Sequence, residues 1–204
     1  MRRIVRRTLA IVGAVVLAGV VIAAAVFGGS RLSASPSPSY AIYAEYAHGS
    51  NKLMKDGLNR RVFNKVEAQV GSDIALNSDG SITLEPGTYR ISGFSITTMQ
   101  TTFAPPEPKN DNNYPGYALV YPLADESDGE SALEHAIGIG SPQNALDTTP
   151  SLLDLVYTTK TKTKIAVGHQ SGDDLNDEVY LSVYEVAGIP SDYHVFARIS
   201  ITKL

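Results

Sequence analysis

The chain has 204 residues, a formal net charge of −4 and a sequence pI near 5.5. This slightly acidic balance gives no electrostatic reason to expect nucleic acid as a partner. The sequence contains no cysteine, which excludes disulfide bonds, thiolate metal sites and cysteine nucleophiles. A packed core or an oligomer must therefore supply the stability of an exported domain.

The amino-terminal residues predict a membrane segment. Residues 1–7 carry four arginines and no acidic residue, and residues 8–27 form an uncharged stretch. As a helix that rises about 1.5 Å per residue, this stretch would cross the roughly 30 Å hydrocarbon core of a bilayer. Because arginines favour the cytoplasmic side, we expect a single-pass cell-membrane protein with its carboxyl-terminal domain outside. A cleaved signal peptide is the alternative, and the protein would then be secreted.

The rest of the chain divides into a linker and one domain. Residues 28–39 are rich in glycine, serine and proline, which is typical of a partly extended spacer. Residues 40–204 have the length of a single domain. Short β segments alternate there with turn residues, and no repeat or long helical pattern interrupts them. We therefore predict an all-β antiparallel sandwich preceded by one transmembrane helix.

Turn residues mark the first predicted strands. Residues 73–76 and 81–84 flank the pair Asp79-Gly80, which tolerates positive φ angles and so predicts a β-hairpin. The following Pro86-Gly87 fits a type II turn, in which glycine occupies the position with positive φ.

The next strand changes its pattern at Gly93. Tyr89 and Ile91 share one face, whereas Phe94 and Ile96 share the other. A β-bulge at Gly93 would let both pairs point inward. The alternative is an unbroken strand that is buried on both faces.

Alternation with a period of two predicts most of the later strands. In the last of them, Ala197, Ile199 and Ile201 are expected to face the core. Residues 62–70 also fit a helix. The other predicted strands are residues 117–123, 151–159, 163–170, 179–184 and 195–202.

Three polar stretches are predicted as loops that would carry any ligand surface: residues 103–116, 124–131 and 171–178. Residues 125–130 are expected at an exposed loop tip. The acidic run 173–178 could bind Ca²⁺, although it lacks the spacing of an EF-hand and a solvated loop is the simpler interpretation.

The sequence predicts no catalytic, cofactor or metal residue. The four histidines lie in no metal-ligand spacing, and no Gly-x-Ser-x-Gly elbow is present. His169 shares a strand face with Ile165 and Val167, which predicts a hydrogen-bonded histidine in the core or at an interface. We therefore expect a protein that is not an enzyme.

Aromatic residues suggest an interface. Tyr180, Tyr184 and Phe196 are expected on strand faces opposite the core residues. Exposed aromatic rows need a covering surface, and tyrosine and phenylalanine are favoured where interfaces form. A second layer of the same sandwich could also cover them.

Several stretches resemble the C1q/TNF-like jelly-roll superfamily, in particular its bacterial and phage members. The first runs from residue 58 to 91 and includes the turn motif Pro86-Gly87-x-Tyr89. The others are residues 137–141, 178–181 and 195–204. The resemblance implies a jelly roll that forms a homotrimer around an apolar and aromatic axis. No collagen-like stalk precedes the domain, and the calcium-binding acids of some members have no match here.

We therefore expect a membrane-tethered, non-enzymatic binding or assembly domain, which is trimeric and lies outside the cell. Its partner would be an unknown protein or glycan. One alternative is a carbohydrate-binding, lectin-like jelly roll with an aromatic platform beside Ca²⁺ or a polar cluster. Another is a structural surface or virion component that self-associates without a soluble ligand.

Overall fold

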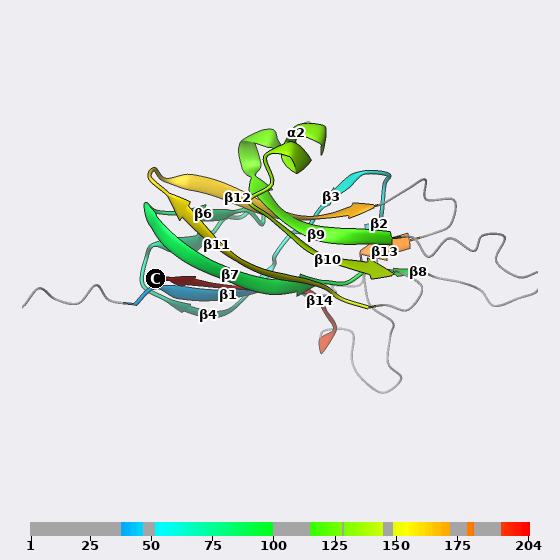
Figure 1. The fold of residues 1–204 in the computed structure, drawn as a ribbon. Coiled ribbons are helices and arrows are strands. Elements are labelled where there is room, and N and C mark those ends of the chain that lie inside the picture. The colour runs from blue at the N-terminus through cyan, green and yellow to red at the C-terminus, as the bar shows by residue number, and fades with distance from the viewer. Residues whose placement is uncertain are drawn as a thin grey trace, which may run out of the picture. The chain divides into compact units, whose positions relative to one another are not determined.

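The computed structural model describes residues 38–46, 52–99, 115–127, 129–144, 149–171, 179–181 and 193–204. All of them belong to one compact unit, Pro38–Leu204 (Figure 1). The predicted membrane segment, residues 8–27, lies outside the described residues. Within the described ranges, no helix is long and apolar enough to cross a membrane.

The first layer of the sandwich is a five-stranded antiparallel sheet in the order β11-β7-β14-β1-β4. Its strands are β1 (Tyr40–Tyr46), β4 (Lys65–Val70), β7 (Gly87–Ser95), β11 (Ser151–Thr159) and β14 (Val195–Lys203). The segment 62–70, which also fitted a helix, therefore contains a strand. β11 and β4 form the two edges of this sheet.

The second layer is a six-stranded sheet in the order β10-β9-β12-β6-β5, with β3 also paired to β12. Its strands are β3 (Leu58–Arg60), β5 (Ile74–Leu76), β6 (Ile82–Leu84), β9 (Pro115–Pro122), β10 (Gly138–Asn144) and β12 (Thr163–Ser171). A small sheet joins β2 (Lys52–Leu53), β13 (Val179–Leu181) and β8 (Thr98–Met99) in the order β2-β13-β8.

The chain passes repeatedly between the two main sheets, which is the connectivity of a jelly roll. β6 leads into β7 of the other sheet, β10 leads into β11, and β11 leads back into β12. Figure 1 shows the two sheets stacked face to face. The prediction of an all-β antiparallel sandwich is confirmed.

The core lies between the sheets because alternate side chains of each strand point inward. Ala197, Ile199 and Ile201 of β14 are at most 1% exposed, as their alternation predicted. They pack with Tyr43 of β1 and Ile91 of β7 in one continuous apolar cluster. Burying an aliphatic side chain of this size contributes about 1.5–3 kcal/mol.

The predicted hairpin at Asp79-Gly80 is confirmed. β5 and β6 pair antiparallel, and the amide of Gly80 donates to the carbonyl of Asn77 at 2.9 Å. Gly80 has a φ of +79°, and a β-carbon there would lie 2.8 Å from Val62 Cγ1. The predicted type II turn at Pro86-Gly87 is wrong, because Gly87 starts β7 with a φ of +159°, far from the roughly +80° of that turn.

The bulge predicted at Gly93 is also wrong. β7 pairs with β11 and with β14 in unbroken register. Phe94 therefore stays on the face opposite Tyr89 and Ile91. A β-carbon at Gly93 would collide with the backbone carbonyl of Arg198. The glycine thus allows close approach of β14, and it does not change the direction of the following side chains.

Residues 124–131 form more than an exposed loop tip. They contain parts of a short 3-10 helix, η1 (Leu123–Asp125), and an α-helix, α2 (Gly129–Glu134). Ala132 of α2 is fully buried against Leu119, Tyr121 and Ala166. Figure 1 shows α2 on the outer side of β9 and β12, so this helical segment covers part of the six-stranded sheet.

Candidate functional site

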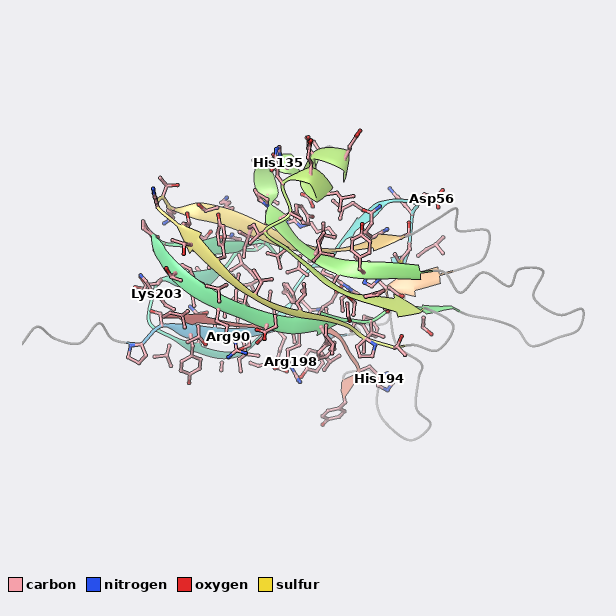
Figure 2. All side chains as sticks on the ribbon, in the orientation of Figure 1. Asp56, Arg90, His135, His194, Arg198 and Lys203 are labelled. Atoms are coloured by element: carbon pink, nitrogen blue, oxygen red, sulfur yellow. The ribbon has the colours of Figure 1, made fainter. Side chains whose placement is uncertain are left out.

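The two outer faces of the sandwich differ in what covers them. α2 and η1 cover part of the six-stranded sheet, where Leu123 and Leu133 pack on the buried cluster beneath. No described segment covers the five-stranded sheet in the same way. Figure 2 shows Arg90 and Arg198 on that uncovered side, opposite His135 and α2.

Aligned residues cross the uncovered face in rows. Val70, Tyr40, Thr202, Arg90 and Val156 are successive pairing partners from β4 to β11. The apolar members at the two ends are well exposed, at 41% for Val70, 39% for Tyr40 and 62% for Val156. The face is therefore apolar toward both edges and polar in the middle.

Ion pairs order the polar middle of the face. Arg90 donates from Nε and Nη2 to the two carboxylate oxygens of Asp154, at 3.1 and 3.0 Å. This pairing raises the pKa of Arg90 and lowers the pKa of Asp154. Arg198 donates to Glu67 at 2.8 Å, and the Tyr46 hydroxyl donates to the same oxygen at 2.6 Å. Both bonds lower the pKa of Glu67, with that from Arg198 the larger cause.

Two apolar patches flank this polar middle. The β10–β11 patch consists of Ile139, Leu152 and Val156, which are 55%, 58% and 62% exposed. These strands are edges of the two sheets and are joined where the amide of Leu152 donates to the Ser141 hydroxyl at 2.9 Å. The β1–β4 patch consists of Tyr40, Ile42 and Val70 on the opposite side of the face.

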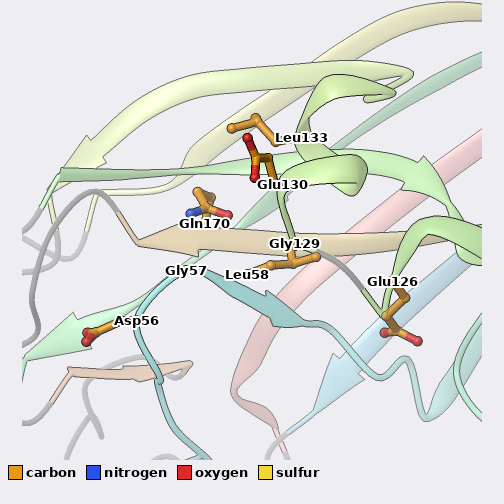
Figure 3. Close-up of a pocket in the computed structure, with 8 residues that line it drawn as sticks. All are labelled: Asp56, Gly57, Leu58, Glu126, Gly129, Glu130, Leu133 and Gln170. Atoms are coloured by element: carbon orange, nitrogen blue, oxygen red, sulfur yellow. The ribbon is translucent and has the colours of Figure 1, made fainter.

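A pocket of about 490 Å³ lies on the other side of the molecule, beside α2 (Figure 3). It includes parts of one predicted ligand loop, residues 124–131, and ends next to another, residues 171–178. Of the three predicted ligand loops, residues 103–114, 128 and 172–178 lie outside the described residues. The lining residues are Asp56, Gly57, Leu58, Glu126, Gly129, Glu130, Leu133 and Gln170.

Hydrogen bonds hold the floor of this pocket in place. The amide of Gly57 donates to the Ser171 hydroxyl at 2.7 Å, and the Ser171 amide donates to the Gly57 carbonyl at 3.0 Å. Asn59 closes the same turn by donating to the carbonyls of Lys55 and Gly57 at 2.6 and 3.0 Å. The start of β3 is thereby fixed against the end of β12, which carries Gln170.

A buried polar network crosses the core between the two sheets. Arg61 is fully buried, and it donates to the Ser95 hydroxyl at 2.8 Å and to Glu45 at 3.3 Å. Ser95 Oγ lies 2.8 Å from Nδ1 of His169, which is 1% exposed. The prediction of a hydrogen-bonded buried histidine at position 169 is confirmed. Burial, helped by the charge of Arg61, lowers the pKa of His169 to about 3.

This network is not arranged for nucleophilic catalysis. Ser95 is fully buried, and His169 Nε2 has no hydrogen-bond partner among the described groups. A substrate would therefore have to enter the packed core to reach either residue. In the described parts of the chain, no cluster of histidine or acidic side chains could hold a metal ion. The acidic run 173–178 lies outside these parts.

The comparisons with known proteins give structural neighbours. No family model and no curated protein match the sequence. Similar solved structures include murine APRIL (9% identity, 82% of this chain and 99% of that chain, TM-score 0.46). Others are pika GITRL (12%, 82% and 96%, 0.36) and the globular domain of zebrafish complement 1qA protein (10%, 82% and 96%, 0.41). All are of the C1q/TNF-like jelly-roll type.

The structure places the residues that the sequence singled out in different environments. Tyr180 lies in β13, its side chain is not described, and Tyr184 is outside the described residues. Phe196 is 4% exposed within one chain, which agrees with the alternative that the same chain covers it. The interface role of these three residues stays a prediction. Tyr89 is fully buried, and its hydroxyl donates to the Glu85 carbonyl at 2.6 Å, just before Pro86 and Gly87.

The sequence missed the apolar patches and the pocket. Leu152 and Val156 alternate with Leu153 and Leu155 in β11, so the strand reads as apolar on both faces. That pattern predicts burial on both sides. This pattern is the signal in the sequence, and because Leu152 and Val156 are exposed within one chain, a second covering surface is needed.

Proposed function

We propose that residues 38–204 form a non-enzymatic binding and assembly domain that works as a homotrimer. The observation that carries this proposal is the uncovered outer face of the five-stranded sheet, with exposed apolar side chains at both of its edges. Exposed apolar patches of this kind mark interaction surfaces in soluble domains. The number three follows from the C1q/TNF-like resemblance.

The position of the two patches supports a cyclic contact. The β10–β11 patch lies at the β11 edge of the five-stranded sheet and the β1–β4 patch lies toward its β4 edge, so each can contact the other patch of a neighbouring copy. Such a heterologous contact closes into a ring when the rotation between copies is a whole fraction of a turn. The Arg90–Asp154 and Arg198–Glu67 pairs then lie between the patches and restrict how neighbours align.

A matched pair of variants tests the proposed contact. Leu152 in the β10–β11 patch is 58% exposed, and Leu53 on β2, outside both patches, is 54% exposed. Complete burial of a leucine contributes about 1.5–3 kcal/mol, so each contact would gain roughly 1–2 kcal/mol from Leu152. Leu152→Asp would remove this gain and place a charge in the contact, whereas Leu53→Asp introduces the same charge elsewhere.

Sedimentation of the full-length chain in mild detergent, over a dilution series, measures the mass of the protein assembly for each variant. We expect three chain masses for the wild type and for Leu53→Asp. We expect the Leu152→Asp trimer to dissociate at concentrations at least tenfold higher than those at which the wild-type trimer dissociates. A wild-type monomer at every concentration would overturn the trimer, and a stable Leu152→Asp trimer would overturn this contact face.

We further propose that residues 8–27 anchor the domain outside the cell membrane. The four arginines before an uncharged stretch of bilayer length support this topology. The test is protease treatment of intact cells that express the chain with a carboxyl-terminal epitope. The anchor is supported if the chain stays in the membrane fraction during carbonate extraction and if protease added outside the cells removes its epitope. Appearance of a shortened chain in the medium would instead identify a cleaved signal peptide.

A further inference from the structure

The pocket beside α2 presents oxygen atoms that accept hydrogen bonds. Asp56, Glu126 and Glu130 contribute carboxylates, and none of the eight residues described as lining the pocket is basic. Glu126 already accepts from Arg60 Nη1 at 2.8 Å and from the Tyr121 hydroxyl at 3.2 Å. The pocket therefore attracts groups that are positively charged and donate hydrogen bonds.

Gln170 provides a second, independent indication of a ligand. Its carboxamide nitrogen donates to the Ser171 carbonyl at 3.3 Å, which fixes the orientation of the amide. The opposite atom, Oε1, is buried and has no hydrogen-bond partner within the described residues. Figure 3 shows this oxygen on the side of Gly129 and Glu130. A buried acceptor without a donor is costly, so a donor from a ligand would satisfy it.

The remaining lining residues suit an aliphatic stem. Leu58 and Leu133 supply apolar walls, and Gly57 and Gly129 add no side chain that would fill the space. A β-carbon at Gly57 would have Gln170 Nε2 as its nearest neighbour, at 3.9 Å. Because no described acidic cluster converges tightly enough for a metal ion, an extended organic cation fits this arrangement better.

We infer that this pocket binds a primary alkylammonium group, with the ammonium donating to Gln170 and to Glu130 while its methylenes contact the two leucines. Two sources share this chemistry: the side chain of a lysine on a partner protein, and a free alkyl diamine. The site lies on the face opposite the proposed trimer contact, and so it does not depend on that contact.

Ligand-observed NMR titration of the full-length chain in mild detergent tests the inference with three probes. They are Nα-acetyl-lysine amide, 1,5-diaminopentane and the neutral 1-pentanol. Saturable binding of either amine, without binding of pentanol, supports the inference. Preference for the lysine derivative points to a partner protein, and preference for the diamine points to a free polyamine. Equal binding of pentanol, or no saturable binding of either amine, would overturn it.

Three variants locate the binding. Gln170→Met removes the buried acceptor, and Glu130→Gln removes one carboxylate from the lining. Glu134→Gln removes the same charge from the exposed end of α2, outside the lining. We expect the first two to weaken amine binding about tenfold or more and the control to stay within about twofold. Circular dichroism confirms folding of each variant. Unchanged binding by folded Gln170→Met and Glu130→Gln would refute the site.

Discussion

Replacement of His169 by glutamine tests the buried polar network through the pH dependence of stability. The folded chain holds His169 neutral, because burial and the nearby charge of Arg61 lower its pKa to about 3. In the unfolded chain the imidazole titrates near its ordinary value of about 6.5. Between these values the unfolded state binds a proton that the folded state does not. The contribution of neutral His169 to the free energy of unfolding is therefore fully present above about pH 6.5. This contribution is lost as the pH drops toward 3.

The size of this effect follows from the two pKa values. At about pH 5, protonation stabilises the unfolded state relative to the folded state by roughly 2 kcal/mol, whereas at about pH 7.5 the difference is close to zero. Glutamine does not titrate, and its amide can still exchange a hydrogen bond with Ser95. When the pH is lowered from about 7.5 to about 5, the free energy of unfolding of His169→Gln should therefore fall by roughly 2 kcal/mol less than that of the wild type. This difference does not depend on the stability of the variant at neutral pH.

Urea unfolding at equal protein concentrations, followed by tyrosine fluorescence, measures this difference, since the chain has 11 tyrosines and no tryptophan. Other groups titrate in both proteins and cancel in the comparison. Asp79 is one of them, because hydrogen bonds from Ser81 lower its pKa to about 2. Equal losses of stability in the two proteins would show that the folded state protonates His169 freely, and would refute the argument that burial keeps it neutral.

Three further substitutions test the core and its turns by chemical denaturation. Arg61→Met leaves the buried Glu45 without its ion-pair partner and should cost about 3–5 kcal/mol, whereas adding Glu45→Gln should restore part of this loss. A Glu45→Gln addition that restores nothing would contradict the pairing. Gly93→Ala forces β14 away from β7 and should cost about 1–3 kcal/mol or more. Gly129→Ala should be nearly neutral, because the nearest described atom to its β-carbon would be Leu58 Cβ at 3.5 Å. Equal effects of the two alanines would argue against the close approach at Gly93. Tyr89→Phe removes the hydrogen bond to the carbonyl before the turn and should cost about 1 kcal/mol, and an unchanged midpoint would show that this bond contributes nothing.

Local patterns in the sequence predicted the fold class well. Residues 151–159 were predicted as one strand and form β11 with the same limits. The alternation of Ala197, Ile199 and Ile201 identified the buried face of β14. Both predictions succeeded because a period of two and strong turn residues act within a few positions of the chain.

Contacts between residues that are far apart in the chain could not be predicted from local sequence patterns. At Gly93 the change of pattern suggested a bulge, but only the approach of β14 explains why glycine occupies that position. The sequence predicts a loop over residues 124–131, whereas the helix α2 begins at Gly129, because its six residues are too few for a clear period and the helix depends on packing of Ala132 against Tyr121. The pocket brings together residues 56–58, 126–133 and 170, and no local pattern connects them.

The positions of the pocket and the trimer contact on opposite faces have a consequence for valency. In a closed ring the contact faces turn toward the axis, so the three pockets would point outward on one particle. A partner surface with several lysines could then engage two or three pockets at once. Each later contact would form at the high effective concentration set by the first, so weak single-site affinity would become strong overall attachment. Disrupting the ring would then weaken attachment to a surface without altering any single pocket.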